Sequence, residues 1–146
     1  MRCGIKETKK ETKKSVPSNA GPVIPKWILL AEDNKTIQKL VFRFLKYIGF
    51  EVATASNGFE ALALFQEKYF DLVLTDYQMP VMDGLRLAGH IKGRSPGTPV
   101  IMMTGSDREI VRQKMDKEAV EFVIFKPFKL QDLQRTVSEA LASRVL

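Results

Sequence analysis

Carboxylates, a hydroxyl and a lysine stand at the ends of short apolar segments in this 146-residue chain. Glu32 and Asp33 follow one such segment, Asp76 and Thr104 end two others, and Lys126 follows a fourth. The interval from Asp33 to Asp76 is 43 residues, which corresponds to two strand–helix units. The intervals from Asp76 to Thr104 and from Thr104 to Lys126, of 28 and 22 residues, correspond to one unit each. If the segments are strands of one parallel sheet, all five side chains converge on the edge where those strands end. Three carboxylates in one crevice repel each other, so a divalent metal or the lysine must hold them together.

The chemistry that this set supports is phosphoryl transfer onto a carboxylate. Asp76 can attack phosphorus in line, while a metal held by Glu32 and Asp33 neutralises the equatorial oxygens. Lys126 supplies a mobile positive charge, and the Thr104 hydroxyl can donate a hydrogen bond to the incoming oxygen. Carboxylate oxygens, with a backbone carbonyl and waters, are the ligands that Mg²⁺ prefers. The residues therefore predict a phosphoacceptor site that uses Mg²⁺.

The elements that must position these residues alternate regularly from residue 26 onward. Apolar runs predict strands at residues 27–31, 50–55, 71–76, 99–104 and 121–125. Helical periodicity predicts helices that start after Asn34, at Asn57-Gly58, at Asp83-Gly84, at Asp107 and near Leu130. Within these, Gly49 is expected to close the first helix and Tyr69 to lie on the apolar side of the second. The third is expected to run through about Ile91, and the residues expected to break it are Gly93, Ser95, Pro96 and Gly97. The fourth helix is expected to end at about Ala119.

Five short apolar strands separated by helices predict an α/β fold with helices on both faces of a parallel sheet. Right-handed crossovers favour a doubly wound (βα)5 arrangement, for which 2-1-3-4-5 is the common, flavodoxin-like strand order. Ligands of such sheets bind at the carboxyl ends of the strands, beside the point between strands 1 and 3. This is where the acidic residues are expected.

The composition indicates one globular domain, at residues 26–146, with an N-terminal appendage. Hydrophobic residues make up 45% of the chain, which suffices for a core. Residues 1–25 contain six basic and two acidic residues, or +4 of the net charge of +6, and predict a disordered basic leader. A basic arm for nucleic acid is the less favoured interpretation of this leader. The single Cys3 excludes a disulfide framework, and no apolar run approaches the roughly 20 residues of a membrane span. We therefore expect a cytoplasmic protein. We expect no membrane partner and no nucleic-acid partner.

The chain resembles the receiver domain of two-component response regulators. The resemblance spans residues 26 to 143, and its separate motifs occur in the family's order at strand–helix spacing. They are Leu30-Ala31-Glu32-Asp33-Asn34, Asn57-Gly58-Phe59-Glu60-Ala61-Leu62, Asp71-Leu72-Val73-Leu74-Thr75-Asp76-Tyr77-Gln78-Met79-Pro80 with Met82-Asp83-Gly84, Met103-Thr104-Gly105, and Lys126-Pro127-Phe128.

The resemblance implies that Asp76 accepts a phosphoryl group from the phosphohistidine of a sensor histidine kinase or a phosphotransfer protein. It implies Mg²⁺ bound by Glu32, Asp33, Asp76 and the Gln78 carbonyl. It further implies a signalling receiver that assists its own phosphorylation and dephosphorylation, and not an enzyme acting on other substrates. Its output would reach a downstream protein through the face of the fourth helix, fifth strand and fifth helix.

One position departs from the family pattern. Receivers usually carry an aromatic residue three positions before the lysine of strand 5, and here that position is Val123. Phe122 precedes it but is expected to face the other way by strand alternation. A β-branched side chain has few rotamers, so we expect any switch to act through Thr104 and the loop into the fourth helix. The resemblance also implies a cis peptide bond between Lys126 and Pro127.

Three other functions on such a fold fit the residues less well. A flavin or nucleotide binder needs phosphate-cradling amides after strand 1, where Glu32 and Asp33 would repel the ligand. An aspartyl-phosphate phosphatase usually carries a second acid two residues after the nucleophile, where Gln78 stands. A DNA-binding regulator needs an effector domain after the last helix, and the given sequence ends at Leu146. We expect a single-domain receiver, with a receiver fragment of a hybrid histidine kinase, or a phosphorelay intermediate without its own output, as the alternative.

Overall fold

The computed structural model describes residues 24–105, 107–114 and 119–144. The disordered leader expected at residues 1–25 lies almost entirely outside these ranges. Within them, no helix is both long and apolar enough to span a bilayer.

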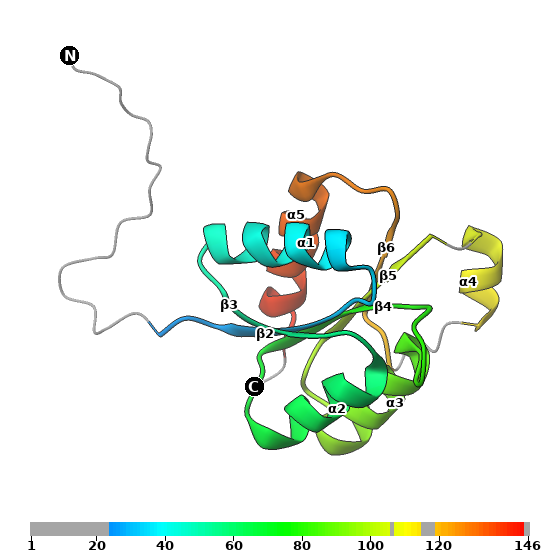
Figure 1. Cartoon of the computed structure of the whole chain (residues 1–146), viewed down its shortest axis with the longest axis horizontal. Helices are drawn as coiled ribbons and strands as arrows, with labels where there is room; N and C mark the ends of the chain where they lie inside the picture. The colour runs from blue at the N-terminus through cyan, green and yellow to red at the C-terminus, as the bar shows by residue number, and fades with distance from the viewer. Residues whose placement is uncertain (1–23, 106, 115–118, 145–146) are drawn as a thin grey trace, which may run out of the picture.

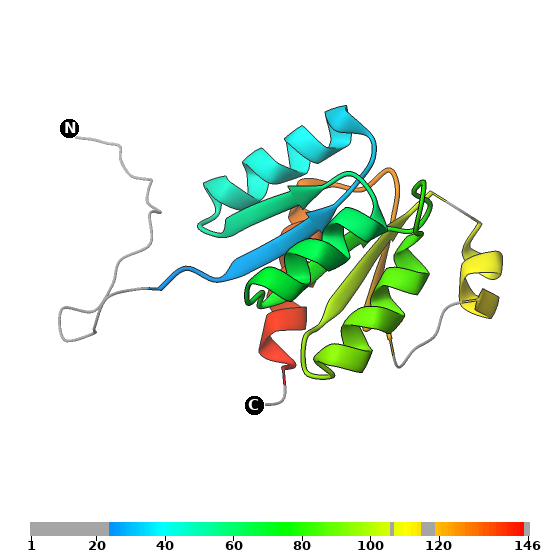
Figure 2. The ribbon, with the colours of Figure 1, turned by 60° about the horizontal axis from the view of Figure 1, so that its bottom comes forward.

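Five parallel strands form one sheet, as predicted. They are β2 (Trp27–Ala31), β3 (Glu51–Ala55), β4 (Leu72–Asp76), β5 (Val100–Thr104) and β6 (Phe122–Phe125). The order across the sheet is β3-β2-β4-β5-β6, which is the predicted order 2-1-3-4-5 in chain sequence. Figure 2 shows the strand arrows pointing the same way, so their carboxyl ends lie at one edge of the sheet.

The described residues form five helices, of which the first four connect successive strands and the last follows β6. They are α1 (Lys35–Tyr47), α2 (Gly58–Glu67), α3 (Gly84–Arg94), α4 (Arg108–Lys114) and α5 (Leu130–Ala142). Helices α1 and α5 cover one face of the sheet, and α2 and α3 cover the other (Figure 1). The result is the predicted three-layer α/β architecture.

Strand alternation divides the interior into two cores. In β2, Leu29 packs toward α2 and α3, while Ile28 and Leu30 pack toward α1 and α5. Every residue of β4 and β5 is buried, because both strands are central and covered on both faces. Residues that fill the first core include Val73, Leu87, Ile91 and Met102; those of the second include Val41, Leu45, Leu74, Leu133 and Val137.

Side-chain caps start the three helices next to the acidic edge. Asn34, Asn57 and Asp83 each accept a hydrogen bond from the backbone N–H three residues later, at 3.0, 2.8 and 2.8 Å. Gly49 adopts a φ of 110° directly after α1 and turns the chain into β3, as expected.

Two helix predictions were wrong in detail. Helix α2 ends at Glu67, so Tyr69 lies beyond it and is 62% exposed. Helix α3 continues through Gly93 to Arg94, because a glycine is tolerated in an exposed helix at a cost of about 1 kcal/mol. It ends at Ser95, where the following proline disfavours helical backbone. The described part of α4 ends at Lys114, and residues 115–118 of the expected helix lie outside the described ranges.

Candidate functional site

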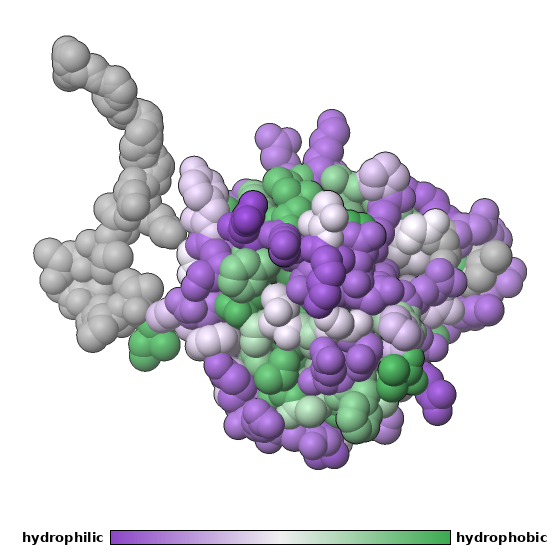
Figure 3. Space-filling model, in the orientation of Figure 1, coloured by the Kyte–Doolittle hydropathy of each residue, from purple (hydrophilic) through white to green (hydrophobic). Residues whose placement is uncertain are grey.

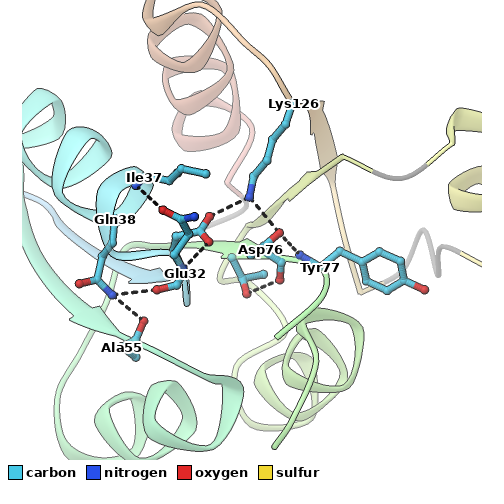
Figure 4. Close-up of polar contacts among 9 residues, drawn as sticks. Glu32, Ile37, Gln38, Ala55, Asp76, Tyr77 and Lys126 are labelled. Atoms are coloured by element: carbon cyan, nitrogen blue, oxygen red, sulfur yellow. Dashed lines mark hydrogen bonds and ion pairs between the residues drawn. The ribbon is translucent and has the colours of Figure 1, made fainter. Parts of the chain in front are cut away.

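The carboxyl ends of four strands bring the predicted residues to one edge of the sheet, where Figure 4 shows the side chains of Glu32, Asp76 and Lys126 meeting. Glu32 follows β2, Asp76 is the last residue of β4, Thr104 is the last residue of β5, and Lys126 follows β6. Strand β2 pairs with β3 on one side and β4 on the other, so Glu32 and Asp76 flank the point where the strand order reverses. The structure thus places these side chains at the edge where doubly wound sheets bind ligands.

Lys126 bridges two of the carboxylates. Its Nζ lies 2.9 Å from Glu32 Oε1 and 3.2 Å from Asp76 Oδ1, although the residues are far apart in sequence. Glu32 is completely buried, whereas the Lys126 side chain remains 20% exposed. A buried carboxylate is costly unless it is paired, so the lysine offsets much of the cost of placing Glu32 there.

Backbone contacts fix the lysine. The Lys126 N–H donates to the Thr104 carbonyl at 2.8 Å, which joins the ends of β5 and β6. The peptide bond between Lys126 and Pro127 is cis, which confirms the expectation from the family resemblance. Attraction from Glu32 and Asp76 outweighs burial and raises the pKa of Lys126, so the ammonium stays charged at neutral pH.

Asp76 is buried, with 8% of its surface exposed, and its Oδ1 also accepts a hydrogen bond from the Tyr77 N–H at 2.8 Å. Burial, and after it the negative charge of Glu32, raises the pKa of Asp76 from its ordinary value of 3.8 to about 6, against the opposing effect of Lys126. Its second carboxylate oxygen receives no hydrogen bond from any of the described residues. At neutral pH the side chain is therefore largely ionised and offers one oxygen for chemistry.

Asp76 belongs to a cluster of three carboxylates that could hold a metal ion. Carboxylate oxygens of Glu32, Asp33 and Asp76 all lie within 4.8 Å of one another. Asp33 is exposed, whereas the Glu32 oxygens already accept from Lys126 and, at 3.0 Å, from the Asn34 N–H. This donor set suits Mg²⁺, which binds few carboxylates and retains several waters. Because the Glu32 oxygens already accept hydrogen bonds, Glu32 is suited to attract a metal ion mainly through its charge. The exposed Asp33 is the more accessible ligand.

The loop after Asp76 is held by two close backbone approaches. The Gly58 N–H, at the start of α2, donates to the Met82 carbonyl at 3.0 Å, and a Cβ on Gly58 would lie 2.5 Å from that oxygen. A Cβ on Gly84 would lie only 2.0 Å from the Asp76 carbonyl oxygen. The Asn-Gly and Asp-Gly pairs were interpreted only as helix starts, yet they also fix the loop that carries Gln78, which is exposed.

Sequence reasoning missed Gln38. This residue of α1 is 8% exposed, and its Nε2 donates to the carbonyls of Glu32, at 2.8 Å, and Ala55, at 3.1 Å. It therefore braces the ends of β2 and β3 beneath the acidic edge. The only available signal was a polar residue on the otherwise apolar side of α1.

The face of β6 next to α4 contains an aromatic residue that sequence reasoning also missed. Val123 packs toward the α2–α3 core and Phe122 toward the opposite core, as strand alternation predicted. Phe125 lies two residues after Val123 and pairs in register with the buried Thr104. The Arg108 guanidinium, from α4, lies 4.1 Å from the centroid of the Phe125 ring.

Comparisons with known proteins agree with this geometry. Residues 28–138 match the family model of the response regulator receiver domain. The transcriptional regulatory protein ZraR of Klebsiella oxytoca is 38% identical over 116 residues, which cover 79% of this chain and 26% of that protein. The chain thus spans about a quarter of the length of this relative.

Two solved structures show the same fold. The response regulator TrrA of Thermotoga maritima, in complex with Mg²⁺ and BeF, has a TM-score of 0.73 at 31% identity, covering 79% of this chain and 98% of that one. The receiver domain of the sensor histidine kinase PA1611 of Pseudomonas aeruginosa, with a magnesium ion in its active-site cleft, has a TM-score of 0.76 at 26% identity. This match covers 82% of the present chain and all of the other.

Proposed function

Because this chain belongs to the response regulator receiver domain family of two-component signalling, we propose that it accepts a phosphoryl group on Asp76. The observation that carries the proposal is the ionised, buried Asp76 carboxylate beside Lys126 and within 4.8 Å of two further carboxylates. A structural role alone does not account for this set, since three clustered carboxylates destabilise one another.

In the proposed reaction the free Asp76 oxygen attacks phosphorus, the bond from phosphorus to a donor histidine nitrogen breaks, and the electron pair leaves with the imidazole. Lys126, which already contacts Asp76, pairs with the new phosphoryl group. The buried Thr104 hydroxyl lies at the end of the adjacent strand and would donate a hydrogen bond to one of its oxygens. Gly105 follows with open space at its Cβ position, so a phosphoryl group can approach without a steric clash.

The proposed metal ligands are Asp33, Asp76 and the Gln78 carbonyl, with Glu32 contributing mainly charge. The chemistry that bound Mg²⁺ supplies is neutralisation of the phosphoryl oxygens during transfer. Without it, Glu32 and Asp33 would oppose the approach of an anionic donor. The proposed donor is a sensor histidine kinase or a phosphotransfer protein, and the proposed output surface is formed by α4, β6 and α5.

A phosphorylation assay with intact mass tests the proposal. The full chain is incubated with a small phosphodonor and Mg²⁺, and we expect one added phosphoryl group, which is absent in Asp76→Asn and in excess chelator. Asp71→Asn is the matched control, because Asp71 lies near the opposite ends of the strands and pairs with Arg144. Persistent label in Asp76→Asn would show that the acceptor is another residue.

A second candidate function is that of a relay intermediate, which passes the phosphoryl group to a histidine and has no output of its own. The similarity to a sensor-kinase receiver favours it. Pre-phosphorylated chain is mixed with a histidine phosphotransfer domain, and rapid return of label to the histidine would favour the relay over a terminal receiver.

A further inference from the structure

Helix α1 carries an unusual charge distribution. It contains four cations, Lys35, Lys39, Arg43 and Lys46, and no acidic residue. Their spacing of four, four and three residues places them along one side of the helix. Figure 3 shows hydrophilic side chains, interrupted by small hydrophobic areas, over the face of the molecule where α1 lies.

The two outer cations of this row are already engaged. Lys35 Nζ lies 2.5 Å from Ser56 Oγ, and Lys46 Nζ lies 2.9 Å from Glu51 Oε1. Lys39 and Arg43 are exposed, and no described residue forms an ion pair or side-chain hydrogen bond with either. The centre of the row therefore holds two positive charges that the described part of the chain does not neutralise.

These two cations line a hollow beside strand β3. Its volume is about 280 Å³, and it is bounded by Gln38, Lys39, Phe42, Arg43 and Thr54. The wall thus combines two positive charges with an aromatic ring and a hydroxyl. Such a hollow suits an anionic group accompanied by an apolar one.

The hollow opens onto an unpaired sheet edge. β3 is the terminal strand, with β2 as its only neighbour in the described sheet. The Glu51 N–H and the Ala55 carbonyl bond toward β2, so the intervening Val52 and Thr54 direct their backbone groups outward. An exposed strand edge of this kind is a template for an added strand.

We propose that α1 and the β3 edge form a docking surface for an extended acidic peptide of a partner protein. The peptide adds a strand to β3, and its carboxylates on the α1 side pair with Lys39 and Arg43, while the alternate apolar side chains lie on the opposite, α2 side of the sheet. This surface is separate from Asp76 and does not depend on phosphorylation.

Charge argues against three other occupants of this surface: the N-terminal leader, a second copy of the chain and nucleic acid. The leader carries +4, so Lys39 and Arg43 repel it. A second copy of the chain that paired along the same edge would place its own Lys39 and Arg43 close to these two cations, and the like charges would repel. Nucleic acid is disfavoured because residues 26–146 carry a net charge of only +2, well short of the many phosphate contacts that give useful affinity.

The test is amide chemical-shift titration of the unphosphorylated full chain. The probe is an acetylated peptide of about eight residues that alternates glutamate and valine, a length typical of a strand with its flanks. We expect shifts at Val52–Ser56 and on α1, and weaker binding at high salt. Lys39→Gln combined with Arg43→Gln should weaken binding about fivefold or more, since each exposed pair contributes modestly. Arg86→Gln, an exposed cation on α3, is the matched control and should leave binding unchanged.

Four results would overturn the proposal. These are equal affinity in the double variant, equal binding of a peptide with lysine in place of glutamate, equal binding of a peptide N-methylated at alternate residues, and no shifts up to about 1 mM peptide. Tighter binding of oligouridylate at the same amides would assign the surface to nucleic acid instead. All of these outcomes are read without phosphorylation, so they are independent of the result for Asp76.

Discussion

Neutralising Asp76, the proposed phosphoacceptor, should raise the free energy of unfolding in a pH-dependent way. The pKa of Asp76 rises from 3.8 to about 6 on folding, chiefly by burial and then by Glu32. The folded state therefore binds the proton more tightly than the unfolded state, and the stability gained from Asp76 is lost as pH rises from about 4 through about 6. This pKa change corresponds to about 3 kcal/mol that the ionised side chain costs at neutral pH.

Asp76→Asn removes this cost while keeping the shape of the side chain. Lys126 retains Glu32 as a partner at 2.9 Å, so the variant leaves no unpaired buried charge. We expect Asp76→Asn to exceed the parent in free energy of unfolding by about 2 to 3 kcal/mol at pH 7.5, and by close to zero at pH 4.

Urea denaturation measures this difference, with chelator present so that no metal neutralises the site. The single tryptophan, Trp27, lies at the start of β2 and reports unfolding without added labels. Glu139→Gln, which neutralises an exposed carboxylate on α5, is the control and should change stability by less than about 0.5 kcal/mol. If Asp76→Asn is no more stable than the parent, or if its advantage is the same at pH 4 and pH 7.5, the electrostatic reasoning is wrong.

Three further predictions concern the metal, the loop and the switch. Asp33→Asn should weaken Mg²⁺ binding about tenfold, measured by calorimetry, without lowering the stability of the metal-free protein; unchanged affinity would remove Asp33 from the ligand set. Gly58→Ala should lower the free energy of unfolding, measured in urea, by about 2 kcal/mol or more, because the new Cβ meets the Met82 carbonyl oxygen. Gly93→Ala is the control: its Cβ meets no atom within 4 Å, so it should raise the free energy of unfolding by up to about 1 kcal/mol. Beryllofluoride with Mg²⁺ should shift amides mainly in the loop between β5 and α4, and Arg108→Ala, which removes the contact with Phe125, should reduce the shifts on α4; a response centred on β6 with that loop unmoved would contradict this mechanism.

Local sequence determined the elements and their order. Short, largely apolar runs of five or six residues placed each strand to within a residue or so. Asn34, Asn57 and Asp83 marked helix starts through side-chain caps that reach only three residues along the chain. In a parallel sheet the carboxyl ends of the strands share one edge. The sequence therefore predicted that Glu32 and Asp76 lie close together there.

Helix ends and isolated side chains were less predictable. Tyr69 fits the spacing of α2, yet the helix stops two residues earlier and leaves the ring 62% exposed. Of the residues expected to break α3, Gly93 is tolerated within the helix, whereas Ser95 and the proline after it do mark its end. Both outcomes depend on small differences in free energy between continuing and ending a helix at a single residue. Hydrophobic periodicity does not give these differences.

The sequence alone thus specified which residue types meet at the acidic edge, because that follows from strand order and the polarity of each strand. Only the tertiary structure decided how they meet: Lys126 bonds to Glu32 as well as Asp76, Gln38 braces the strands from below, and the Arg108 guanidinium covers an aromatic ring beside Thr104. The physical reason is distance along the chain. Hydrogen bonds, burial and the resulting pKa of Asp76 depend on atoms contributed by segments dozens of residues apart, and their separations are fixed only when the two cores pack around the sheet.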